Sequence, residues 1–166
     1  TNVWTFPIGA VWAQHFELEM TNGAPESRRR VETRVLVRDN TAHYGVTYRW
    51  DSPTNATLVP PEGAEEVFAI TENGTQRMQT WHYPTRENCL DCHHSQAGRA
   101  LGFNTPQLNR DFDYAAYAGV VDNQLRALAN AGYFSSTVSN IHGLPVMARI
   151  DDTSVGVQHR ARSYLM

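Results

Sequence analysis

The chain has 166 residues, of which 41% are hydrophobic and 19% are charged. This composition is typical of a folded soluble protein rather than a disordered one, and no apolar run is long enough to predict a transmembrane segment. The net charge is −3, and the 14 basic residues are all arginines. Without lysine there is no Schiff-base or P-loop lysine, and without a basic stripe we expect no nucleic-acid partner.

Residues 1 to 80 alternate between apolar and polar side chains, as strands do. Trp4, Phe6 and Ile8 share one parity and predict a first strand, and residues 11–18 predict a second. Residues 31–50 predict a hairpin around Asp39-Asn40-Thr41. The dipeptide Asn73-Gly74 predicts another, joining residues 67–70 to 77–81.

After Pro84 the pattern changes to short helices and irregular loops. Residues 86–94 predict a helix. Asp122 is the expected cap of a second helix. In this second helix Leu125, Leu128 and Ala129 would face inward, and Gly132 would end it. A last helix, capped by Thr153 or Ser154, would present one apolar face, made of Val157, Ala161, Tyr164 and Leu165.

These patterns predict an α+β protein with two parts. Residues 1–80 would form an antiparallel β-sandwich or barrel-like domain. Residues 81–166 would form a small helical region packed against it, and the chemistry expected there depends on two neighbouring cysteines.

The two cysteines lie in the string Cys89-Leu90-Asp91-Cys92-His93-His94. The pattern Cys-x-x-Cys-His is the attachment sequence of c-type haem, because one helical turn brings both thiols to the porphyrin edge and the histidine to the iron. A dithiol redox site and a zinc site are the two other interpretations. No βαβ pattern surrounds the motif and no second compact ligand pair is present, so haem c is favoured.

The motif and its surroundings resemble a family of bacterial multi-domain, di-haem type c-type cytochromes. The resemblance begins with Trp81-His82-Tyr83-Pro84-Thr85-Arg86-Glu87-Asn88 before the first cysteine and continues through Leu101-Gly102-Phe103-Asn104-Thr105-Pro106-Gln107-Leu108-Asn109-Arg110. It also includes residues 4–9, 15–18, 44–50, 122–125 and 152–165, and so spans nearly the whole chain.

The resemblance implies a cytochrome c-like fold for residues 81–166 and a periplasmic or extracellular location. Some members of the family are fused to sugar-dehydrogenase-like β-propellers. Expected partners are therefore other redox proteins or haem domains, including a fused or associated dehydrogenase. A second haem motif would follow Leu165, which implies that this chain is an internal mono-haem module of a longer protein.

His93 is the expected proximal iron ligand, and its other ring nitrogen needs an acceptor. The carbonyl of Pro106 resembles the proline carbonyl that serves in small c-type cytochromes. Met147 is the candidate sixth ligand, because a methionine loop before a closing helix is similar to class I cytochromes. Four other side chains remain open as sixth ligands: His82, Met78, His94 and His142.

Arginines bind carboxylates through two parallel hydrogen bonds, so Arg86 and Arg99, which flank the motif, are candidate partners of the haem propionates. Trp81 is a further candidate haem contact, and His82, at the strand end beside it, suits a haem edge equally well without ligation. The expected function is one-electron transfer. The alternatives are a haem enzyme or sensor with an open iron, binding peroxide or a gas, and a zinc-stabilised β-sandwich interaction module.

Overall fold

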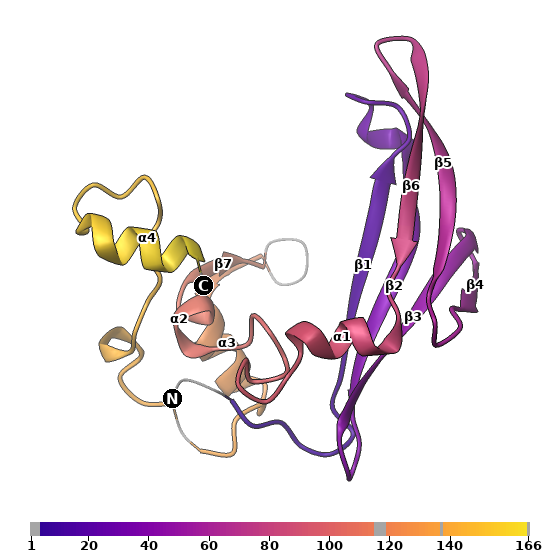
Figure 1. The fold of residues 1–166 in the computed structure, drawn as a ribbon. Coiled ribbons are helices and arrows are strands. Elements are labelled where there is room, and N and C mark those ends of the chain that lie inside the picture. The colour runs from indigo at the N-terminus through magenta and orange to yellow at the C-terminus, as the bar shows by residue number, and fades with distance from the viewer. Residues whose placement is uncertain (1–3, 115–118, 137, 166) are drawn as a thin grey trace. The chain divides into compact units, whose positions relative to one another are not determined.

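The computed structural model describes residues 4–114, 119–136 and 138–165 (Figure 1). Contacts divide these residues into two compact units. One comprises residues 5–100 and is called the β unit. The other, the C-terminal unit, comprises Trp4 and residues 101–165 as far as they are described. The expected boundary at residues 80 and 81 falls inside a strand, Thr75–Tyr83, and the cysteine motif belongs to the β unit.

The β unit contains a four-stranded antiparallel sheet in the order β1-β2-β3-β4 (Figure 1). Its strands are β1 (Val11–Glu19), β2 (Arg28–Arg38), β3 (His43–Ser52) and β4 (Asn55–Leu58), and a 3-10 turn, η1 (Pro25–Ser27), precedes β2. Val35 lies opposite Val46 in the β2–β3 ladder. The hairpin predicted for residues 31–50 and the strand predicted for residues 11–18 are both confirmed.

A second hairpin pairs β5 (Ala64–Glu72) with β6 (Thr75–Tyr83). Asn73 and Gly74 form its turn, with φ angles of 51° and 75°. Asparagine and glycine tolerate this left-handed region best, so the two-residue signal predicted this turn for a physical reason and is confirmed. The hairpin is joined to the turn after β1 by a parallel bridge between Thr21 and Thr71.

The β5–β6 hairpin packs against one face of the four-stranded sheet. The ring of Trp81 lies 6.2 Å from that of Phe16, and the guanidinium of Arg29 lies 5.3 Å from the ring of Phe68. A bulge leaves Val31 without a partner on β1, since Phe16 pairs with Glu32 and Glu17 with Arg30. The buried apolar residues of the β unit are Val31, Leu36, Val59, Phe68, Ile70, Tyr83 and Ala100.

The first strand predicted from Trp4, Phe6 and Ile8 is wrong, because the described chain enters its first strand at Val11. Pro7 has no amide hydrogen to give to a ladder, and Gly9 turns the chain at a φ of 88°. The amide of Gly9 then donates to the carbonyl of Arg38, which begins the pairing of β1 with β2.

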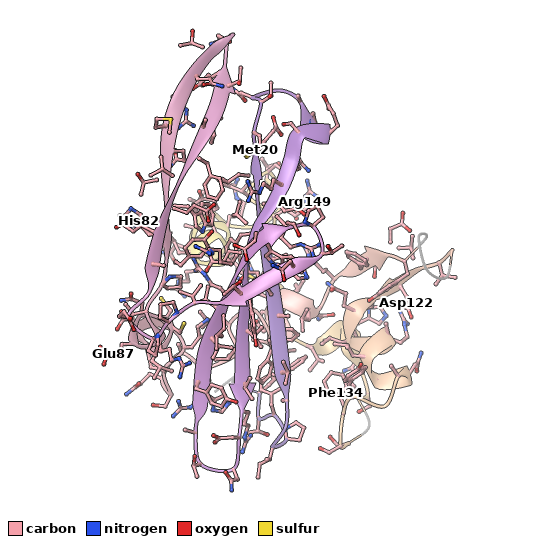
Figure 2. All side chains as sticks on the ribbon, turned by 90° about the vertical axis from the view of Figure 1, so that its right-hand side faces the viewer. Met20, His82, Glu87, Asp122, Phe134 and Arg149 are labelled. Atoms are coloured by element: carbon pink, nitrogen blue, oxygen red, sulfur yellow. The ribbon has the colours of Figure 1, made fainter. Side chains whose placement is uncertain are left out.

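The C-terminal unit contains short elements joined by loops. These are α2 (Thr105–Leu108), β7 (Asp111–Asp113), β8 (Val121–Asn123), α3 (Gln124–Asn130), a 3-10 turn η2 (Ile141–Gly143) and α4 (Val157–Leu165). Helix α3 buries the apolar side chain of Leu125, which is 2% exposed. Trp4 packs edge-on against Phe134, which is labelled in Figure 2, and donates its indole hydrogen to Thr105.

Two sequence-based expectations for these helices need correction. The cap of α3 is Asn123, whose side chain accepts from the amide of Leu125, whereas Asp122 instead pairs with Arg126 at 2.7 Å. The predicted apolar face of α4 is not buried: Val157, Tyr164 and Leu165 are 71%, 73% and 82% exposed. This helix is held by polar contacts to the preceding loop, so its apolar spacing was not a sign of a core.

Candidate functional site

Helix α1 (Arg86–Cys92) carries both cysteines and starts directly after β6. Thr85 caps it: its hydroxyl accepts from the amide of Asn88 at 3.0 Å, and the Asn88 side chain accepts in return from the amide of Thr85 at 3.2 Å. This reciprocal cap fixes the first turn of α1. A helix was predicted over residues 86–94, and α1 ends at Cys92. Cys89 and Cys92 then lie three residues apart, on neighbouring positions of one helix face.

Cys89 is half-buried, because α1 packs closely on β3. A methyl carbon placed on Gly45 of β3 would lie 2.6 Å from both Cβ and Sγ of Cys89, so a glycine is needed at this contact. The thiol donates to the carbonyl of Thr85 over 3.6 Å. Burial raises the pKa of the Cys89 thiol, although the nearby guanidinium of Arg34 opposes the rise.

Cys92 is exposed, and both cysteines are free thiols in the described structure. A reactive dithiol depends on a thiolate whose pKa has been lowered. The pKa of Cys89 is shifted in the opposite direction, which keeps that sulfur protonated at neutral pH. Cys89 therefore lacks the lowered thiol pKa on which a dithiol redox site depends.

His93 ends α1, and its amide donates to the carbonyl of Cys89 at 3.0 Å. Its Nδ1 atom is hydrogen-bonded to the carbonyl oxygen of Arg99. Arg99 has a φ of 63°, so the chain turns back here toward the end of the helix. Because this contact occupies Nδ1, a metal would bind the ring through Nε2.

Pro106 was the expected acceptor for this histidine, and it lies in α2 of the C-terminal unit. Its carbonyl accepts the amide of Met147 at 3.1 Å. Within the β unit, the acceptor for His93 is instead the carbonyl of Arg99. An imidazole that binds a metal through Nε2 has one ring hydrogen, at Nδ1, and in this structure it is given to Arg99, so the expectation that Pro106 is the acceptor is wrong.

A small open pocket of about 110 Å³ lies between α1 and the sheet. Ligand pockets for drug-sized molecules have about 300 to 1,000 Å³, so this pocket can cover only part of a larger group. Cys89, Cys92 and His93 all line it. The other lining residues are Arg34, Val35, Leu36, Gly45, Pro84 and Asn88.

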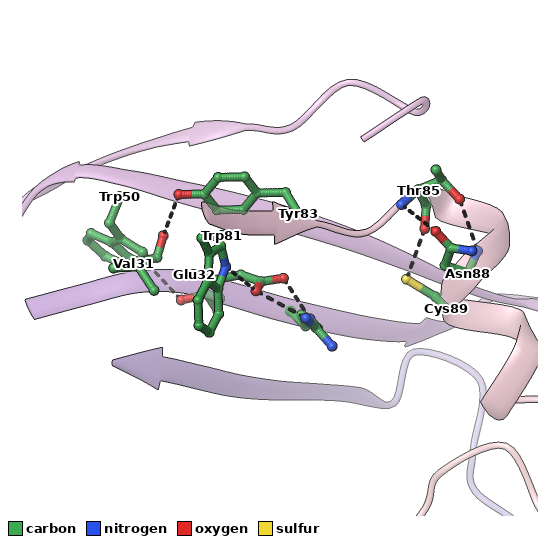
Figure 3. A network of polar contacts seen from close by, with 10 residues as sticks. Val31, Glu32, Trp50, Trp81, Tyr83, Thr85, Asn88 and Cys89 are labelled. Carbon is green, nitrogen blue, oxygen red and sulfur yellow. Dashed lines mark hydrogen bonds and ion pairs between the residues drawn. The ribbon is translucent and has the colours of Figure 1, made fainter. Parts of the chain in front are cut away.

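Beside the pocket lies a fully buried carboxylate, Glu32 on β2 (Figure 3). Arg34 donates to it from Nε at 2.6 Å and from Nη2 at 3.1 Å, and the indole of Trp81 donates at 2.9 Å. Trp81 is thus bound to a structural carboxylate next to the motif. Sequence reasoning missed Glu32 and Arg34, which have the spacing of an ordinary polar strand face.

The two arginines predicted for the propionates occupy different surroundings. Arg86 is exposed in the first turn of α1. Arg99 is half-buried, and its backbone carbonyl is the acceptor for His93. Arg34, which lines the pocket, already makes two hydrogen bonds to Glu32.

The candidate sixth ligands also differ in their surroundings. Met78 is 67% exposed on β6. His82 is exposed on the outer side of the hairpin and pairs with Glu65 at 2.8 Å (Figure 2). His94 and His142 are exposed as well, and His94 is bonded to Gln96 at 3.0 Å.

Met147 is half-buried in the C-terminal unit, and three hydrogen bonds surround its backbone. Its own amide donates to the carbonyl of Pro106 at 3.1 Å. The preceding carbonyl, of Val146, accepts from His159 at 3.2 Å, and the following amide, of Ala148, donates to Ser163 at 2.9 Å. The backbone around Met147 is therefore held by contacts within the C-terminal unit, as the backbones of Met78 and His82 are held by the β5–β6 ladder.

In the part of the chain that the structure describes, no three His, Cys, Asp or Glu side chains gather into a metal-binding group. Within the same residues, no helix is both long and apolar enough to cross a bilayer.

Comparisons of the chain with models of protein families, with curated proteins and with solved structures found no match. The case for a function therefore depends on the motif residues and on the geometry around α1.

Proposed function

We propose that the chain is the haem-binding module of an extracytoplasmic c-type cytochrome and that it transfers single electrons. The observation that carries this proposal is the arrangement on α1: two thiols one helical turn apart, followed by a histidine whose Nδ1 is held by the carbonyl of Arg99. This arrangement leaves Nε2 of His93 as the atom for the iron.

Cys89 and Cys92 would hold the haem through thioethers. Each thiol adds across a vinyl double bond, so that an S–C and a C–H bond form while the S–H bond and the π bond are lost. No leaving group and no net oxidation are involved. The protonated, half-buried thiol of Cys89 suits this addition better than it suits dithiol exchange.

The bound haem would supply the exchange between Fe(III) and Fe(II), while the chain supplies ligation, burial and docking. The pocket of about 110 Å³ in the β unit would take one edge of the tetrapyrrole, next to Leu36 and Gly45. The sequence resemblance proposes Met147 as the sixth ligand. A thioether at this position raises the reduction potential relative to a second imidazole.

The wider proposal follows the sequence resemblance. It places the module in the bacterial periplasm or outside the cell, within a longer cytochrome of the multi-domain family. Its partners would be other haem domains or a fused or associated dehydrogenase.

The test is the intact mass of the denatured protein after expression in the periplasm with the haem-attachment machinery. We expect the sequence mass plus one haem, and an absorption spectrum that survives acid–organic extraction. Replacing Cys89 and Cys92 together by serine should remove both. Colourless protein of unmodified mass from the same cells would overturn the proposal.

Neighbouring histidines provide a matched pair of variants. His93→Ala should remove the proximal ligand and change the spectrum, because the half-buried ring of His93 follows the second cysteine directly. His94→Ala should leave the spectrum unchanged, because its exposed ring is bonded to Gln96. Equal spectra for both variants would contradict the assignment of His93.

A further inference from the structure

One row of side chains connects the cysteine helix to a buried charge, and all of it lies within the β unit. Glu32, Arg34 and Leu36 alternate along β2, so they lie on one face of the sheet. Leu36 lies opposite Gly45 of β3, and Gly45 is the residue that touches Cys89. The row therefore runs from the carboxylate of Glu32, past Arg34, to the pocket beside α1.

The charge at the far end of this row is fully shielded from water. The side chain of Glu32 is 0% exposed, whereas that of Arg34 is 41% exposed, so water screens the charge of Glu32 less. Arg34 donates two hydrogen bonds to the carboxylate and Trp81 donates a third (Figure 3). The guanidinium of Arg34 also lies 4.4 Å from the ring of Phe16. These contacts fix the position of the buried charge relative to the pocket.

Stability alone is a weak reason for this arrangement. Apolar residues of the same volume often stabilise a protein as well as a buried ion pair does, or better. A buried charge does, however, act on other charges over distances at which an exposed charge is screened. Since Arg34 lines the pocket together with Cys89 and His93, a haem attached there would lie within reach of this field.

We infer that Glu32 sets the reduction potential of the haem: its buried negative charge favours Fe(III) over Fe(II) and so lowers the potential. The inference rests on the proposed function and deepens it. The oxidised haem carries one more positive charge than the reduced haem, so a fixed anion near it stabilises the oxidised form. The identity of the sixth ligand does not enter, because the same ligand is present in every protein that is compared.

The test compares Glu32→Gln with wild-type holoprotein by potentiometric titration, followed by the absorption of the reduced haem. Loss of the negative charge should shift the equilibrium roughly tenfold toward Fe(II), which is about 59 mV for one electron. Two unit charges about 12 Å apart, at an effective dielectric constant of about 20, give an effect of that order.

Glu32→Asp separates the charge from the packing, because it keeps the carboxylate and shortens the side chain. Both variants should lose stability, but the potential of Glu32→Asp should stay close to that of wild type. A purely structural role for Glu32 would move the two potentials alike.

Asp51→Asn is the matched control, because it also removes a carboxylate charge that is paired with an arginine of the same sheet, Arg49, at 3.1 Å. Asp51 is 36% exposed, and it lies about 20 Å along β3 from Gly45 at the usual rise of a strand. The potential of Asp51→Asn should equal that of wild type. An equal shift in Asp51→Asn and Glu32→Gln would overturn the inference, since neither burial nor nearness to the pocket would then matter.

A second measurement does not require Glu32→Gln to fold. Coupling between two charges is reciprocal, so reduction of the iron perturbs the carboxylate of Glu32. In wild-type holoprotein with isotope-labelled glutamate, the infrared difference spectrum between the reduced and oxidised forms should contain a labelled carboxylate band. Glu32→Asp should lose this band. Glu66→Asp should keep it, because the carboxylate of Glu66 is bonded to Tyr83 rather than to Arg34.

The outcomes separate this inference from the proposed function. An unchanged potential in Glu32→Gln, or equal shifts in Glu32→Gln and Glu32→Asp, overturns the role of Glu32 and leaves the haem proposal intact. A wild-type spectrum without a labelled band overturns it in the same way. Protein without covalent haem overturns the proposed function, and this inference with it.

Discussion

The β unit is built mainly by backbone ladders, whereas the C-terminal unit depends on side chains that bond to backbone. In the first, β1, β2 and β3 are strands of 9, 11 and 10 residues that pair strand to strand. In the second, β7 and β8 have three residues each, and Asn109 and Asn123 connect the start of α3 to the loop of residues 141–145. Repeated patterns therefore specify the first unit, and a few individual residues specify the second.

The largest expected effect is in the β unit, from Arg34→Met. This change leaves the fully buried Glu32 with the indole of Trp81 as its remaining hydrogen-bond donor among those described. Removing one partner of a buried ion pair typically costs 3–5 kcal/mol, and since Arg34 is 41% exposed we expect about 3 kcal/mol. Urea unfolding followed by tryptophan fluorescence measures this loss.

Arg49→Met is the matched control for Arg34, because its side chain is equally exposed. It pairs with Asp51, which is 36% exposed, at 3.1 Å. Exposed pairs of this kind contribute about 0–1 kcal/mol. Similar losses of unfolding free energy in the two variants would show that the burial of Glu32 does not increase the contribution of its ion pair to stability.

A smaller effect is expected in the C-terminal unit, from Asn123→Ala. The change removes the cap of α3 and the donor that orients Asn109. Loss of a helix cap costs about 1 kcal/mol, and hydrogen exchange should show the loss in residues 105–147 while β1 to β3 stay protected. Equal deprotection of the β unit would break the distinction between the two units.

An effect of similar size at neutral pH is expected from Tyr83→Phe, which removes the hydrogen bond from the buried hydroxyl to Glu66 at 2.8 Å. We expect a loss of about 1 kcal/mol. Burial raises the pKa of Tyr83, and the bond to Glu66 raises it further. A raised pKa in the folded state gives stability that is complete below the unfolded value near 10 and is lost as pH rises above it.

Unfolding free energies measured from pH 8 to pH 12 test this prediction. Wild type should lose stability in the alkaline range, and Tyr83→Phe should have a flatter profile there. Tyr133→Phe is the matched control, because it makes the same change at a side chain that is 76% exposed. An unchanged alkaline slope in Tyr83→Phe would assign the loss to another group.

Sequence patterns predicted the elements that a single local rule determines. Asn73-Gly74 marked the β5–β6 turn, and residues 86–94 predicted α1, since turn chemistry and helix caps act over a few residues. Contacts distant in sequence had no such signal. Glu32 and Trp81 are 49 residues apart, and their bond forms only once the hairpin lies on the sheet.

The failures have equally specific causes. The apolar spacing on α4 predicted a buried face, yet helix spacing does not say whether a surface is available to cover it. Asp122 and Asn123 are both good capping residues, and the end of β8 decided between them. Asn109 lies within the stretch that carries the family resemblance, but the carbonyls that it binds are 32 to 36 residues away, so no local rule predicted those contacts.

The contact between Gly45 and Cys89 also has a consequence for which substitutions the chain can tolerate. Gly45 is the third residue of β3, within a strand, where larger residues are normally preferred. A side chain there would meet Cβ of Cys89 as well as its sulfur, both at 2.6 Å. Replacing the cysteine by alanine or serine keeps the Cβ, so the restriction at position 45 does not depend on the thiol or on anything attached to it. In a mutational scan, position 45 should therefore accept glycine alone even in chains that have lost both cysteines.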